Sequence, residues 1–108
     1  MSDYYILDGH KVVPSTIDEW ARWSETEREN RRVAQDTICG HDVSTVFLGL
    51  DHQWDDLGPP HLFETMVFGG PLDQEQERCS TWEQAEKMHE DMCNRVRAIN
   101  KTEDERSI

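Results

Sequence analysis

The chain has 108 residues, of which 35% are hydrophobic and 31% charged, and its net charge is −12 at neutral pH. That length supports one domain with a small core and excludes two. Four tryptophans, three phenylalanines and two tyrosines supply enough apolar area to exclude a disordered chain. We therefore predict a single domain over residues 1–100 and a flexible acidic tail over residues 101–108.

The first elements are a hairpin and a helix. Residues 4–13 predict a small β-hairpin that turns at residues 8–11 and lies at the edge of the main sheet. Thr16 followed by Glu19 is a capping box, and apolar residues at helical spacing come after it. This pattern predicts a helix over residues 17–27.

The middle of the chain predicts three antiparallel strands, over residues 32–38, 43–50 and 62–68, because these runs are rich in β-branched and aromatic residues. Residues 39–42 predict the turn between the first two strands, which would place Ile38 opposite Val43. The acidic segment that follows the third strand, up to residue 77, predicts a loop.

The last element is a helix that begins after a second capping box, Ser80 with Glu83, and whose apolar spacing continues to Ile99. The element order is β-hairpin-α-β-β-β-α. It predicts an α+β domain with an antiparallel sheet of three to five strands and both helices on one face. A double-stranded RNA-binding domain has the same α-β-β-β-α order, but this chain lacks the basic face that such a domain presents to phosphates.

The negative charge is concentrated in residues 33–77, which contain nine acids and no lysine or arginine. We predict that this segment forms an anionic surface that repels nucleic acid and anionic membranes and attracts basic proteins. The surface would be lost if arginines from the flanking segments lay across these acids. The arginines in question are Arg22, Arg28, Arg31, Arg32 and Arg78.

Trp54 lies between acids in a predicted loop, and an aromatic ring surrounded by carboxylates is typical of a binding hot spot for a basic partner. The alternative is that Trp54 folds back and closes the end of the hairpin. The predicted partner-binding residues are Trp54, Asp51, Asp55, Asp56, Asp73, Glu75 and Glu77.

Three histidines suggest a second function. His52 and His61 would lie at the same end of a hairpin, and His89 on the last helix could add a third nitrogen ligand for a divalent metal. The protein would then be a metal-binding protein or a metal-dependent hydrolase. The alternative is that His52 and His61 are loop residues and that His89 is a core-edge histidine bonded to the backbone.

The second face of the sheet, with Phe47, Met66 and Phe68, could form a homodimer interface, or another part of the chain could cover it. A dimer with a pocket at that interface could also sequester a small ligand, although the lack of bases weakens this idea for anionic ligands.

An enzyme is the less favoured interpretation, since the sequence has neither a nucleophile elbow nor a phosphate-binding glycine loop. We predict no catalytic residues and no cofactor. The three cysteines form no CxxC pair, which favours a reduced cytoplasmic setting. We expect neither a signal peptide nor a membrane span.

The phrases STVFLGLDH, LFETMVFGGPLD and CSTWEQAEKMH, with a YILDG opening and an EWARW helix in the same order, resemble a group of short proteins from tailed bacteriophages and prophages. The resemblance spans residues 4–98, and the group carries no catalytic assignment. It implies a phage-encoded protein that acts in the bacterial cytoplasm. By analogy with small acidic phage proteins, it implies an inhibitor that mimics nucleic acid on a basic host or defence protein.

Overall fold

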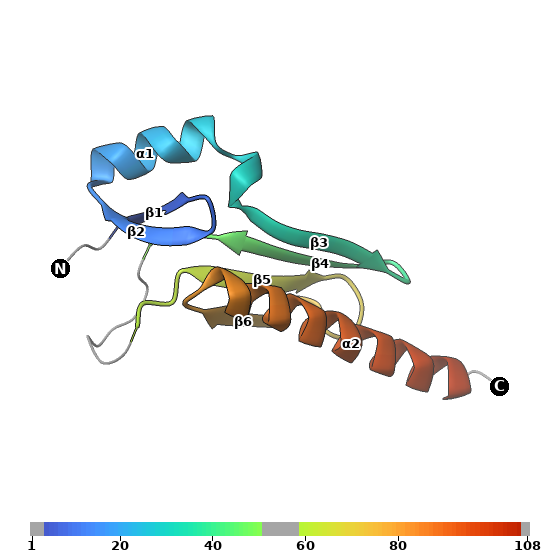
Figure 1. The fold of residues 1–108 in the computed structure, drawn as a ribbon. Coiled ribbons are helices and arrows are strands. Elements are labelled where there is room, and N and C mark those ends of the chain that lie inside the picture. The colour runs from blue at the N-terminus through green and yellow to red at the C-terminus, as the bar shows by residue number, and fades with distance from the viewer. Residues whose placement is uncertain (1–3, 51–58, 107–108) are drawn as a thin grey trace.

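The computed structural model describes residues 4–50 and 59–106, which form two antiparallel sheets and two α-helices (Figure 1). The predicted α+β class is confirmed. The strands are β1 (Tyr4–Asp8), β2 (Lys11–Ser15), β3 (Arg32–Ile38), β4 (His41–Phe47), β5 (Phe63–Phe68) and β6 (Gln76–Cys79). The helices are α1 (Ile17–Thr26) and α2 (Trp82–Arg106), and a short 3-10 turn covers Glu29–Arg31.

The main sheet has four strands in the order β3-β4-β5-β6, all antiparallel. Its β3–β4 turn uses only Cys39 and Gly40, both with positive φ, as two-residue hairpins prefer. Ile38 therefore faces His41 and not Val43, so the predicted register is wrong by two residues. A shift of two keeps every side chain on its predicted face, because side chains alternate with a period of two.

The first two residues of strand β6, Gln76 and Glu77, lie in the segment predicted to be a loop. Strand β6 pairs with β5 from Phe63↔Cys79 to Met66↔Gln76 and forms one edge of the sheet. Its sequence, QERC, carries no apolar alternation, which is common for a short edge strand that water reaches.

The β1–β2 hairpin forms its own two-stranded sheet. It turns at Gly9 and His10, within the predicted turn, and it meets the main sheet through a bridge between Tyr4 and Leu50. The backbone N–H of Tyr5 also donates to the Gly49 carbonyl at 2.8 Å. The hairpin therefore extends the end of β4 instead of lying along the sheet edge.

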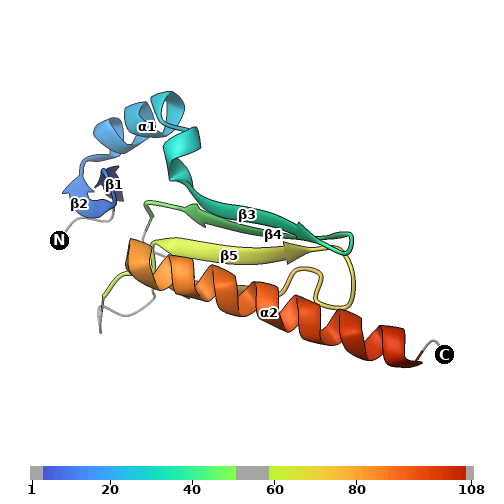
Figure 2. The ribbon, with the colours of Figure 1, turned by 45° about the vertical axis from the view of Figure 1, so that its right-hand side comes forward.

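Helix α1 begins at the predicted cap, where the Thr16 hydroxyl accepts a hydrogen bond from the Glu19 backbone N–H. The helix packs on β1 and lies at one end of the main sheet (Figure 2). Two tryptophans connect it to β4: Trp20 Nε1 donates to the Leu48 carbonyl at 3.3 Å, and Trp23 contacts the Phe47 ring edge-on. Helix α1 thus rests on the hairpin at the end of the sheet, so the predicted placement of both helices on one sheet face is wrong for α1.

Helix α2 lies along one face of the main sheet and contacts all four strands (Figures 1 and 2). Its cap is one residue later than predicted: the Thr81 hydroxyl accepts from the Gln84 backbone N–H, and Gln84 Oε1 accepts from the Thr81 N–H. Thr81 with Gln84 is itself a capping-box pattern. The helix also continues to Arg106, beyond the residue where its apolar pattern ends.

The core lies between α2 and the inner face of the sheet, in two adjoining clusters. One is aromatic and gathers around Phe47, Phe63 and Trp82, where α1, the hairpin and α2 meet. The other is aliphatic and gathers around Val43, Val67 and Met92. Between them, the same inner face carries polar residues.

Gly49 is required where the hairpin meets β4. Its φ is +74°, and a Cβ there would lie 2.6 Å from the Tyr5 carbonyl oxygen and 2.4 Å from Trp20 Nε1. We expect Gly49→Ala to lower the free energy of unfolding by well over about 1 kcal/mol. Gly9→Ala is the matched control, since Gly9 has a φ of +63° and open space around it. Equal losses for the two variants in urea unfolding would contradict this account of the junction.

Candidate functional site

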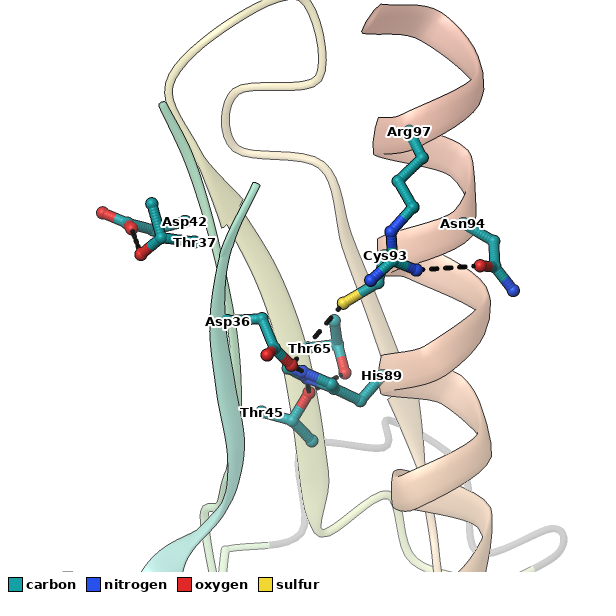
Figure 3. Close-up of polar contacts among 9 residues, drawn as sticks. All are labelled: Asp36, Thr37, Asp42, Thr45, Thr65, His89, Cys93, Asn94 and Arg97. Atoms are coloured by element: carbon teal, nitrogen blue, oxygen red, sulfur yellow. Dashed lines mark hydrogen bonds and ion pairs between the residues drawn. The ribbon is translucent and has the colours of Figure 1, made fainter. Parts of the chain in front are cut away.

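A chain of four hydrogen-bonded side chains crosses the core beneath α2 (Figure 3). Asp36 Oδ2 lies 2.7 Å from His89 Nε2, and His89 Nδ1 lies 2.7 Å from Thr45 Oγ1. Thr45 Oγ1 in turn lies 2.5 Å from Thr65 Oγ1. The Cys93 thiol completes the group, with its Sγ 3.9 Å from Asp36 Oδ2. We refer to Asp36, Thr45, Thr65, His89 and Cys93 as the polar cluster.

Four elements, β3, β4, β5 and α2, build the polar cluster. Thr45 and Thr65 are directly opposite each other on β4 and β5, on the face that α2 covers. His89 and Cys93 are four residues apart on α2, so they lie on one side of the helix. Asp36 comes from the edge strand β3, where it faces Val43.

Along this row of hydrogen-bonded side chains, burial decreases from Thr65 to Asp36. Thr45 and Thr65 are fully buried and His89 is 5% exposed, whereas 56% of the Asp36 side chain is exposed. The chain therefore runs from the middle of the core to the solvent at the sheet edge, and each buried polar side chain in it has a partner, as buried polar groups require.

The proton positions follow from the partners. A carboxylate only accepts hydrogen bonds, so His89 Nε2 donates to Asp36. When the ring is neutral, Nδ1 has no proton and must accept from the Thr45 hydroxyl, which then accepts from Thr65. The two hydroxyls can rotate to the opposite direction, so Thr45 can also accept from a protonated Nδ1. The Thr45 and Thr65 hydroxyls can therefore hydrogen-bond to the His89 ring whether or not Nδ1 carries a proton.

The Asp–His–Thr order resembles the relay of a hydrolase, but the surroundings exclude that chemistry. Thr45 lies under α2 with no exposed surface, so a substrate carbonyl cannot reach its hydroxyl. Burial also raises the pKa of the Cys93 thiol; Asp36 raises it further, and Arg97 opposes the rise. Without a bound metal ion, the Cys93 side chain is therefore a thiol and not a nucleophilic thiolate.

The predicted metal set is brought together only in part. His89 is in the polar cluster and bonds to side chains, not to the backbone as in the alternative interpretation. His61 lies just before β5 and is half-buried, and it is not in the one three-ligand group found among the described residues. His52 lies outside the described residues. Asp36 and Cys93 were missed, although the four-residue spacing of His89 and Cys93 on one helix face was readable from the sequence.

The predicted anionic surface is partly neutralised. Of its acids, Asp51, Asp55 and Asp56, with Trp54 among them, lie outside the described residues. Asp73 accepts from the Gly69 N–H, and Arg95 of α2 lies 3.2 Å from Glu75 and 3.5 Å from Glu77. Glu64 pairs with Arg78 at 2.9 Å. Arg78 is one of the five arginines whose pairing would remove the surface, whereas Arg31 donates to the Phe47 carbonyl. Arg95, which is not one of those five arginines, pairs with two of the acids.

A cleft of about 530 Å³ opens where the hairpin turn, the end of α1 and the start of α2 meet. Three carboxylates line it, from Asp8, Glu27 and Glu29. The Trp23 indole and a stacked pair, His10 on Trp82 with ring centroids 3.8 Å apart, form its flat walls. Arg32 also lines it, so acids outnumber the fixed positive charge by three to one.

The predicted dimer face is wrong in one residue. Phe47 pairs with Phe63 on the inner face and is fully buried, so it cannot join Met66 and Phe68, which alternate to the outer face. The cause is the register of the two strands, which the sequence alone did not specify. Phe68 is 48% exposed, and whether the outer face forms a dimer stays a prediction.

Comparison with family models, with curated proteins and with solved structures finds no match to this chain. Within the described residues, neither helix has a stretch that could span a membrane.

The Thr45 hydroxyl can be tested by Thr45→Val, which removes it without changing the shape of the side chain. We expect the free energy of unfolding to fall by about 1–3 kcal/mol, because His89 Nδ1 and the Thr65 hydroxyl lose their partner in the core. In the control Thr37→Val, an exposed hydroxyl is removed that lies 2.6 Å from Asp42 Oδ1. That change should stay within about 0.5 kcal/mol, and a similar cost for both variants would show that the buried chain does not hold α2.

Cys79 gives a test by pH. Burial raises the pKa of this thiol to about 11, with a hydrogen bond to Thr81 opposing. The thiolate is the reactive form, so alkylation of Cys79 by iodoacetamide should speed up about tenfold per pH unit between about pH 8 and about pH 10. Mass spectrometry resolves the three cysteines. An alkylation rate that levels off above pH 9.0, the ordinary pKa of a cysteine thiol, would contradict the burial of Cys79.

Proposed function

We propose that this protein is a non-enzymatic binding protein that docks an acidic surface onto a basic segment of a partner protein. The observation that carries the proposal is the cleft lined by Asp8, Glu27 and Glu29 and walled by Trp23 and Trp82. Its position differs from the predicted surface, since the cleft lies between the hairpin, α1 and α2 and not along residues 33–77.

The chemistry of the cleft matches an arginine or lysine side chain. Carboxylates accept paired hydrogen bonds from a guanidinium group, whose flat face stacks on aromatic rings. A cation held against an indole gains about 0.5–2 kcal/mol, more when water is excluded. The net charge of −12 adds long-range attraction that speeds the encounter with a basic surface.

The resemblance to tailed-phage proteins supports a host or defence protein as the partner. A surface that normally meets the phosphates of nucleic acid is rich in arginine and lysine. A protein of this charge that occupies such a surface would act as a nucleic-acid mimic and an inhibitor.

The ion pairs of the acids in residues 33–77 also favour the cleft as the binding site. Glu75 and Glu77 share Arg95, so a partner arginine that binds them must first displace an existing ion pair. In the cleft, Glu27 accepts a hydrogen bond from the Asn30 amide, while Asp8 and Glu29 are exposed at its rim. We infer that Asp8 and Glu29 make the first contacts with the partner.

The proposal predicts that a fluorescent oligoarginine peptide binds the protein with an affinity that falls as salt rises. Fluorescence anisotropy measures it. The double variant Asp8→Asn/Glu29→Gln should weaken binding about tenfold. The control Glu90→Gln/Asp91→Asn changes the net charge by the same amount on exposed positions of α2 and should have a much smaller effect. Equal losses for the two doubles would place binding outside the cleft, and affinity independent of salt would contradict the proposed function.

A further inference from the structure

We propose that Asp36, His89 and Cys93 form a Zn²⁺-binding site at the β3 edge of the polar cluster, with water as the fourth ligand. The proposal is independent of the cleft and of its partner.

The three side chains offer the kinds of ligand atom that Zn²⁺ binds. Imidazole nitrogen, thiolate sulfur and carboxylate oxygen are the three ligand types that Zn²⁺ takes in proteins. The three ligand atoms all lie within 4.8 Å of one another. Two come from one helix face at a four-residue spacing and the third from the facing strand, so the backbone that positions them is regular on both sides.

The separations between the ligand atoms are close to those of a tetrahedral zinc site. Zinc bonds of about 2.0–2.3 Å place tetrahedral ligands about 3.3–3.7 Å apart. The Nε2–Oδ2 separation of 2.7 Å must open, and the Oδ2–Sγ separation of 3.9 Å must close slightly. The Asp36 side chain, which is 56% exposed, can make both adjustments by rotating at the sheet edge. Its exposure also gives the ion a path to the site and leaves one position to water.

Thr45 and Thr65 supply the hydrogen-bond acceptor that a metal-bound His89 needs. A histidine that ligates through Nε2 needs an acceptor for the proton on Nδ1, and metal-bound histidines almost always have one. Thr45 Oγ1 lies 2.7 Å from Nδ1 and can accept that proton by passing its own hydrogen bond on to Thr65. The ion would replace the proton between His89 and Asp36, and the hydroxyls would reverse without moving a heavy atom.

Of the charged side chains near Cys93, Asp36 and Glu90 oppose a thiolate and Arg97 favours one. Arg97 extends back along α2 toward Cys93, as Figure 3 shows, and donates to Asn94 Oδ1 at 3.0 Å. A bound Zn²⁺ ion would balance the two negative charges of the Cys93 thiolate and the Asp36 carboxylate.

The experiment is a titration of the purified full chain with Co²⁺, a spectroscopic substitute for Zn²⁺, followed by the near-ultraviolet charge-transfer band of a cobalt–thiolate bond. We expect one equivalent of Co²⁺ to produce the band and Zn²⁺ to abolish it by displacement. Asp36→Asn keeps an acceptor for His89 and should weaken Co²⁺ binding by more than about tenfold, while Cys93→Ser should remove the band.

Cys39→Ser is the matched control, because Cys39 is exposed in the β3–β4 turn and is not one of the three proposed ligands. It should leave the band and the affinity unchanged. Asp36→Asn alters an exposed side chain, so a fold defect will not obscure its result, and circular dichroism checks Cys93→Ser. The proposal is overturned if the wild-type protein gives no band, if the band survives Cys93→Ser, or if Asp36→Asn binds Co²⁺ as tightly as the wild type.

Discussion

The structure depends on the way α2 is held against the sheet. Apolar contacts on both sides of the polar cluster supply most of the attraction, because Phe47, Phe63 and Met92 are almost wholly buried. Such contacts do not fix one register. The bond from His89 to Thr45 does, since a helix that slid or turned would leave a buried imidazole and two buried hydroxyls without partners. The buried hydrogen bonds of the polar cluster therefore fix the position of α2, which contacts all four strands of the main sheet.

This constraint organises both proposed sites. Fixing the register of α2 sets Trp82 at its start against Phe63 and His10, which forms one wall of the cleft. It also sets His89 and Cys93 opposite Asp36. The two sites are about two helical turns apart on α2 and use different chemistry: carboxylates and indoles for a cation on a protein, and a mixed nitrogen, sulfur and oxygen set for a metal ion.

Local sequence signals predicted the local structure well. The cap at Thr16, the hairpin turn near Gly9 and the bounds of β3 were readable, because each depends on residues close in sequence. Features that depend on distant residues were not. The pairing of Phe47 with Phe63, the partner of Asp36 and the ion pairs of Arg95 are set by how strands and helix meet in space. His89 was singled out correctly, but its partners lie 44 and 53 residues away in the sequence.

The central claim is that His89 joins Thr45 to Asp36 through its two ring nitrogens. Long-range ¹⁵N–¹H correlation spectra of the metal-free protein test it directly, because they show which ring nitrogen carries a proton. The account predicts a protonated Nε2 and a Thr45 hydroxyl proton that exchanges slowly with water. A His89 ring with a bare Nε2, or a Thr45 hydroxyl proton that exchanges as fast as that of an exposed threonine, would contradict it.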